Sequence, residues 1–329
     1  MQTKTTNAHG NHIYELRMQE DDTGALYDAL SKGVMLTNPD PSRTDKMFGN
    51  SGHHISWTEI HRLGNGFPTT SGTNINMLPF IMGDKSSLPK EVQQYFPMIE
   101  ACDVEPDQIG KVLYLTIQES DVLAGQTQRR GGLHIEAPPA CTGGKGAGGM
   151  LLYHWGGGAY GGKDADSKDR PRGGIYMASN VSNSTAVYDA QVRLKSISSG
   201  PPIGADGEVV PWAYDDDFNE AGNKQAAANV GEHGDIEHLR PIFEGTEFHL
   251  FPNTIYWMTD RTPHEALPVE AGTHRQYFRL VTSDISVWYR FHSTANPKVA
   301  VPDGIQIIEG SKFMSARDRR AFERDEQRK

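Results

Sequence analysis

The middle and C-terminal thirds of the chain carry short apolar runs separated by turn-forming residues. The runs 112–117 (VLYLTI) and 254–258 (TIYWM) are almost continuously apolar over the length of one strand, which indicates buried strands. The stretch 275–291 is too long for a single strand, and the polar pair Ser283-Asp284 predicts where it breaks. Further strands are expected at 149–155, 174–177, 186–194 and 248–252.

Helical patterns are confined to the flanks of these strands. Residues 87–101 have helical apolar spacing and a proline near their start, which predicts a helix packed on the outside of the core. Residues 311–329 are densely charged and predict a solvent-exposed terminal helix. Many short strands with flanking helices predict a mainly β fold, a mostly antiparallel jelly-roll or cupin-like barrel.

The chain shows no internal repeat, and a single domain over residues 1–329 is expected. In this interpretation residues 1–109 form a mixed helical and strand support for a core at 110–292. Two insertions interrupt the core. The first, 156–174, is glycine-rich and charged and is expected to be a mobile surface loop, whereas 199–235 is polar and acidic and is a candidate lid.

The charge balance excludes two classes of partner. With 32 basic and 42 acidic residues the formal net charge is −10, which repels nucleic acid and anionic lipid surfaces. No apolar run reaches the roughly 18 residues of a membrane span, and the start lacks the apolar segment of a secretory signal. We therefore expect a cytoplasmic protein with a small-molecule partner, and its oligomeric state is open.

Candidate chemistry begins at His134-Ile135-Glu136. Residues two apart on a strand point to the same face, so this imidazole and this carboxylate can reach one metal ion. His264 follows a strand, turn and strand pattern across 247–267 and is the candidate third ligand. Two imidazoles and one carboxylate suit ferrous iron that must keep coordination positions open for other ligands.

Two arginines and a tyrosine follow His264 at alternate positions of a predicted strand. Arg275 lies eleven residues later, and on a strand Arg275, Tyr277 and Arg279 share one face. A buried arginine requires an anion, and a bidentate carboxylate satisfies it well.

The His134-x-Glu136 pair, the Phe251-Pro252 turn, His264 and an arginine eleven residues later resemble the iron(II) and 2-oxoglutarate-dependent oxygenase superfamily. The resemblance covers about residues 110–292. It implies a double-stranded β-helix that uses Fe(II), O2 and 2-oxoglutarate as cosubstrate. Oxidative decarboxylation of 2-oxoglutarate would be coupled to C–H activation of a small, carboxylate-bearing metabolite. The outcome would be hydroxylation, desaturation or a radical ring closure such as the kainoid synthases perform.

The same resemblance assigns roles to individual residues. It implies that Arg275 binds the distal carboxylate of 2-oxoglutarate, with Tyr114 and Thr116 as candidates for a second hydrogen bond. The chain departs from the common arginine-x-serine pairing because Tyr277 stands in the serine position, which leaves Arg279 as an alternative anchor. The candidate substrate-binding residues are Arg129, Arg130, His154 and Trp155.

Two other functions are compatible with the pattern. If His154 joined His134 and Glu136, the site would suit zinc or manganese in a cupin-like isomerase or hydrolase, although the usual cupin motif begins with HxH. A jelly-roll binding module without catalysis would instead use aromatic side chains as its ligand surface. Those aromatic residues are Tyr153, Trp155, Tyr160, Tyr176, Trp257 and Trp288.

Overall fold

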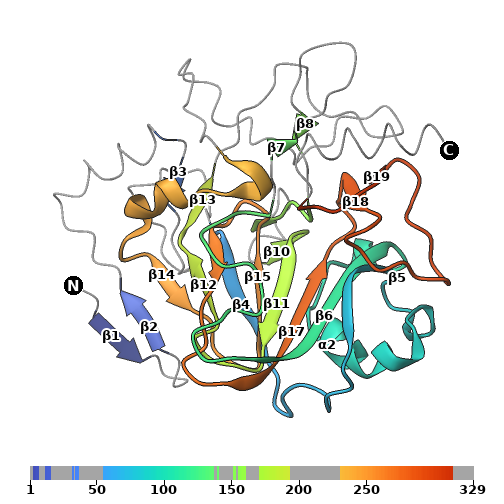
Figure 1. Cartoon of the computed structure of the whole chain (residues 1–329), viewed down its shortest axis with the longest axis horizontal. Coiled ribbons are helices and arrows are strands. Elements are labelled where there is room, and N and C mark those ends of the chain that lie inside the picture. The colour runs from blue at the N-terminus through green and yellow to red at the C-terminus, as the bar shows by residue number, and fades with distance from the viewer. Residues whose placement is uncertain are drawn as a thin grey trace.

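The fold is described by a computed structural model of the chain (Figure 1). The described residues are 3–6, 12–15, 32, 34–36, 55–136, 139–140, 151–152, 155–160, 170–192 and 230–313. Across these residues the protein is mainly β, as the sequence predicts, and its helices are short. None of the helices in these ranges is long and apolar enough to cross a membrane.

The largest element is an antiparallel six-stranded sheet. Its strands, in spatial order, are β4 (Trp57–Arg62), β15 (Thr254–Met258), β11 (Ile175–Ser179), β17 (Thr273–Val281), β6 (Val112–Val122) and β5 (Asn74–Ile81). A second sheet has the order β14 (Glu247–His249), β12 (Thr185–Tyr188) and β16 (His264–Ala266).

Five two-stranded pairs complete the β structure. They are β1 (Thr3–Thr6) with β2 (His12–Glu15), β3 (Val34–Leu36) with β13 (Ala190–Val192), β7 (Pro139–Ala140) with β8 (Leu151–Leu152), β9 (Ala159–Tyr160) with β10 (Pro171–Arg172), and β18 (Val287–Tyr289) with β19 (Gln306–Ile308). Only β18 and β19 pair in parallel among these.

Eight segments of the two main sheets follow a nested pairing. In chain order, β6 pairs with β17, residue 134 bridges to β16, β11 pairs with β15, and β12 pairs with β14. The first segment thus pairs with the last, the second with the seventh, and so on inward. The sheets do not close into a barrel within the described part of the chain, so the closed barrel expected from the sequence is not observed.

An apolar cluster packs on each of the two faces of the six-stranded sheet. On one face of the large sheet, Leu115 and Phe278 pack against the helical segment formed by the 3-10 helices η3 (Lys85–Ser87) and η4 (Lys90–Tyr95) and by α2 (Phe96–Glu100). The helical character predicted at 87–101 is confirmed, but as 3-10 helices and a five-residue α-helix instead of one helix; Figure 1 shows α2 beside β5 and β6. A single cluster on the opposite face joins the large sheet to Val187 of β12.

The remaining helices cover the small sheet and the loops. Ala186 and Tyr188 lie on one face of β12 and pack with the 3-10 helix η9 (Glu237–Phe243). Val187, between them in sequence, therefore lies on the opposite face, toward the large sheet. Two shorter 3-10 turns, η5 (Pro106–Gln108) and η8 (Glu232–Gly234), lie in connecting loops.

Three sequence expectations need correction. The end of the segment predicted as a 199–235 lid belongs to the core, because Ile135 donates its backbone N–H to Gly234 at 3.0 Å; residues 193–229 lie outside the described ranges. Residues 311–313 are not helical, and Lys312 and Phe313 line a pocket; residues 314–329 lie outside the described ranges.

The third correction concerns the 156–174 segment, whose ends are packed and not mobile loop. Gly174 has a φ of +84°, and a Cβ there would lie 2.7 Å from the carbonyl oxygen of Met258 and against the Trp257 ring. Residues 161–169 lie outside the described ranges.

Candidate metal centre

His134 and His264 are joined through their backbones. The N–H of His134 donates to the carbonyl of His264 at 3.1 Å, and the N–H of His264 donates to the carbonyl of His134 at 3.0 Å. Directly opposed residues in an antiparallel pair present their side chains on the same face. The two imidazole rings accordingly lie with their centroids 4.5 Å apart.

Glu136 joins them from two residues along the same segment. Its N–H donates to the carbonyl of Asp260 at 3.0 Å, which extends the pairing past His134 and returns the side chain to the same face. Its Oε1 lies 3.8 Å from Nε2 of His264. One ligand atom from each of the three buried residues lies within 4.8 Å of the other two, so the predicted group is assembled and could hold a metal ion.

The imidazoles are oriented for metal binding. Nδ1 of His134 lies 2.7 Å from the carbonyl oxygen of Gly132, and Nδ1 of His264 lies 2.9 Å from that of Thr262. Because a carbonyl oxygen only accepts, each Nδ1 carries the proton and each Nε2 presents a lone pair. A histidine that donates its other N–H to a carbonyl is the usual arrangement in metal sites.

The electrostatics also favour the ligating protonation states. Burial, together with nearby His264 and Arg130, holds the pKa of His134 well below its ordinary value, so the imidazole is neutral. Burial opposes ionisation of Glu136, but the adjacent Lys312 ammonium and Arg279 guanidinium outweigh it and hold its pKa well below the usual range.

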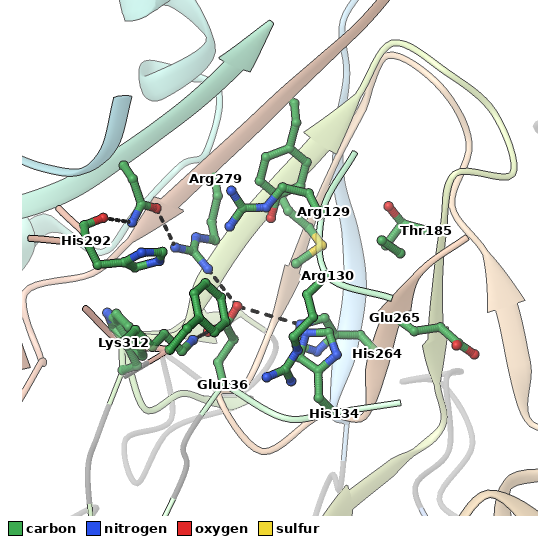
Figure 2. A pocket seen from close by; sticks show the side chains of 16 residues that line it. Arg129, Arg130, His134, Glu136, Thr185, His264, Glu265, Arg279, His292 and Lys312 are labelled. Carbon is green, nitrogen blue, oxygen red and sulfur yellow. Dashed lines mark hydrogen bonds and ion pairs between the residues drawn. The ribbon is translucent and has the colours of Figure 1, made fainter. Parts of the chain in front are cut away.

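Glu136 is bonded at both oxygens. Nη1 of Arg279 donates to Oε1 at 2.6 Å, and Nζ of Lys312 donates to Oε2 at 3.1 Å. Figure 2 shows the carboxylate between these two cations on one side and the histidines on the other. Arg279 is thus paired with a candidate metal ligand and is not a free anchor for an anion.

Arg275 differs from Arg279 in its partners. It is fully buried, and its Nε and Nη2 donate to Ser179 Oγ at 3.1 Å and Thr185 Oγ1 at 3.0 Å. Nη1 has no hydrogen-bond partner among the described residues. Burial lowers the pKa of Arg275 to about 10, as expected for a cation without a neighbouring carboxylate.

The group opens into a pocket that unites several predicted residues. Arg129, Arg130, Trp155 and Tyr277 line it. Both arginines are half-buried, and Arg129 lies over the Tyr277 ring at 5.0 Å from the centroid. Arg275 lies behind its partner Thr185, which is itself a lining residue.

The other predicted residues have different fates. Thr116 Oγ1 accepts a backbone hydrogen bond from Met77 and lies 3.4 Å from Nη2 of Arg279, so it supports Arg279 from behind. Tyr114 is buried in the apolar cluster between the sheets, does not line the pocket, and its hydroxyl has no partner among the described residues. His154 lies outside the described residues.

Several pocket residues were not predicted from the sequence. Asn76 comes from β5, while His292, Lys312 and Phe313 come from the segments that flank β18 and β19. The ring of Phe313 lies against His292 with centroids 4.8 Å apart. No local motif marks these residues, because they reach the site only through long-range folding.

A single guanidinium connects the two histidine-bearing segments. Nη1 and Nη2 of Arg240 donate to the two oxygens of Glu265 at 2.8 and 2.9 Å, and Arg240 also pairs with Glu237. Glu237 in turn accepts the backbone N–H of Leu133 at 2.8 Å. Glu265 follows His264 and Leu133 precedes His134, so Arg240 holds both ligand segments together.

Comparison of the chain with protein-family models, with curated proteins and with solved structures gives no match.

Proposed function

We propose that this protein is a mononuclear iron(II) and 2-oxoglutarate-dependent oxygenase that acts on a C–H bond of a small, carboxylate-bearing metabolite. One observation carries the proposal. A fully buried arginine without a carboxylate partner among the described residues, Arg275, lies on the strand that also bears Arg279, the partner of Glu136. A generic metal site would not require such a cation.

The proposal includes a double-stranded β-helix as the fold. The nested pairing of eight segments is what a long hairpin produces when it is rolled up into two facing sheets. A double-stranded β-helix would place the metal ligands between the sheets, near the bridge between His134 and His264. The wide gap between them in sequence is then spanned by the four middle segments of the roll.

The donor set fits ferrous iron. His134 and His264 would bind it through Nε2 and Glu136 through Oε1, which leaves positions for a chelating cosubstrate and O2. Iron(II) together with 2-oxoglutarate and O2 supplies the oxidising power for C–H cleavage. The hydrogen bond from Arg279 fixes the carboxylate of Glu136, and Asn76 and Thr116 lie against that guanidinium at 3.4 Å.

Arg275 would bind the distal carboxylate of 2-oxoglutarate. Its unpartnered Nη1 supplies a charge-assisted donor, while Ser179 and Thr185 hold the guanidinium plane through its other two nitrogens. Arg129 and Arg130 line the pocket without a carboxylate partner among the described residues and would bind an acidic substrate.

The test is 2-oxoglutarate turnover in the absence of the metabolite. Purified protein reconstituted with Fe(II) and supplied with O2 and 2-oxoglutarate should release succinate slowly, and the release should require iron and be lost in H264A. Bound zinc with no dependence on 2-oxoglutarate would instead favour a cupin-like hydrolase or isomerase. A metal-free protein would favour a binding module.

A cytoplasmic location and the absence of nucleic-acid partners stay predictions, and the net charge of −10 supports the second of them.

A further inference from the structure

The pocket contains more positive than negative charge. Arg129, Arg130, Arg279 and Lys312 line it, in a protein whose overall charge is strongly negative. Two carboxylates also line it, but Glu265 is bound at both oxygens by Arg240. Among the described lining residues, Glu136 is therefore the one carboxylate that faces four cations.

Lys312 is the least expected of these cations. Its residue is 8% exposed, its ammonium lies 4.1 Å from the centroid of the Trp155 ring, and Nζ donates to Glu136 Oε2 at 3.1 Å. The cation–π contact holds the ammonium inside the pocket and away from water. Phe313, the next residue, packs on the His292 ring and attaches this segment to the site.

Arg129 and Arg130 have only neutral partners among the described residues. Nη1 of Arg129 donates to Gln118 Oε1 at 3.1 Å, and Nη1 of Arg130 donates to the carbonyl of His233 at 2.8 Å. Nη2 of Arg130 is buried without a partner. Each of these guanidinium groups lies beside neutral partners and can bind a carboxylate.

A metal ion would increase this imbalance. The single negative charge of Glu136 would then neutralise part of the charge of Arg279 and of a divalent cation. Little of it would remain to neutralise the Lys312 ammonium. The two negative charges of a cosubstrate bound at Arg275 and at the metal would neutralise only the two positive charges of the metal ion. Arg129, Arg130 and Lys312 would still lack anions, and leaving buried cations uncompensated is costly.

We propose that the substrate carries two carboxylate groups, one bound by Arg130 and the other by Lys312. The inference rests on the proposed function in so far as Glu136 and Arg275 are assigned to the metal and the cosubstrate. Lys312 is then a specificity-determining residue contributed by the segment after β19, and it selects diacids over monoacids.

The test is equilibrium binding of simple acids. Glutarate and butyrate serve as diacid and monoacid probes at constant ionic strength, titrated by calorimetry into the protein without metal and again with Mn(II) and saturating 2-oxoglutarate. Glutarate should bind at least about tenfold more tightly than butyrate in both conditions. K312M should remove this preference, K312R should keep it, and K111M, at an exposed lysine paired with Asp107, should not change it.

The variants separate this inference from the proposed function. Glutarate binding that depends on Arg275 and not on Lys312 would place the acid in the cosubstrate site and overturn the inference. Equal affinities for both probes would also overturn it, even if iron and 2-oxoglutarate bind. A Lys312-dependent preference in a protein that binds neither would support the diacid site while the oxygenase proposal fails.

Discussion

His134 and His264 face each other across an antiparallel bridge in which each donates its backbone N–H to the other, at 3.1 and 3.0 Å. The spacing of the two imidazoles is therefore set by main-chain hydrogen bonds and not by side-chain packing alone. Glu136 follows on the same face. The geometry of the candidate metal centre is thus a property of the sheet, and it should survive removal of any one ligand side chain.

His264→Ala tests that expectation. The variant should lose metal retention and succinate release while keeping the fold, because the backbone bridge does not need the imidazole. Metal content after dialysis and far-ultraviolet circular dichroism measure the two properties. H274A is the matched control, since His274 is half exposed and pairs with Asp121 outside the pocket. Stoichiometric iron in H264A would remove His264 from the ligand set.

Substitution of Arg275 should affect 2-oxoglutarate binding, whereas substitution of Arg279 should affect metal binding. Arg275→Gln should raise the 2-oxoglutarate concentration needed for half-maximal succinate release by roughly 10- to 100-fold, because a charge-assisted pair is lost. Arg279→Gln should weaken metal retention first, because Arg279 bonds the candidate ligand Glu136. Titration of 2-oxoglutarate and of Fe(II) in both variants measures the difference. The reverse pattern would move the cosubstrate anchor to Arg279.

Arg240 is expected to position the ligands without touching the metal. Arg240→Met should lower metal affinity by about tenfold, the effect typical of outer partners of metal ligands. Arg240→Lys should recover part of the loss, although an ammonium cannot bond both carboxylates bidentately. R62M is the control, because Arg62 forms a similar pair with Glu59 away from the site. An affinity unchanged in R240M would show that the connection is dispensable.

We expect the buried carboxyl group of Asp189 to make the free energy of unfolding depend on pH. It is 5% exposed, accepts a hydrogen bond from Trp57 Nε1 at 2.7 Å, and burial raises its pKa to about 8. Between about pH 4 and 8 the folded state therefore binds more protons at this site than the unfolded state. The free energy of unfolding should fall as pH rises through this window, by up to about 1.4 kcal/mol per pH unit from this group.

Asp189→Asn separates this effect from the rest of the protein. The amide oxygen can still accept from Trp57, but it does not titrate. The variant should match the wild type near pH 4 and be the more stable of the two at pH 8, as measured by urea unfolding. Parallel stability curves for the two proteins would rule out a neutral, buried carboxyl at Asp189.

The sequence predicted the parts of the site in which side chains two residues apart share a face. The pair His134 and Glu136, and the row Arg275, Tyr277 and Arg279, each follow the two-residue repeat of a strand, and this repeat fixes which side chains share a face. The long strand-rich stretch at 275–291 also breaks as expected, into β17 and β18.

Other parts could not be predicted from local pattern. In β5 the register with β6 shifts between Ile75 and Leu78, and Met77 has a φ of +48°, so the strand lacks the clean alternation that would have marked it as part of the main sheet. Lys312 reaches the pocket from the far end of the described chain. Arg240 acts through two carboxylates brought together only by the fold.

The central claim is that three side chains bind one metal ion while leaving positions open for a chelating diacid. An anaerobic crystal structure with Mn(II), as a redox-stable substitute for Fe(II), and 2-oxoglutarate tests it most directly. The account predicts Mn(II) bound by Nε2 of His134 and His264 and by Glu136, with 2-oxoglutarate on the metal and its distal carboxylate at Arg275. A metal held by a fourth protein ligand such as His154, or no metal between these residues, would contradict it.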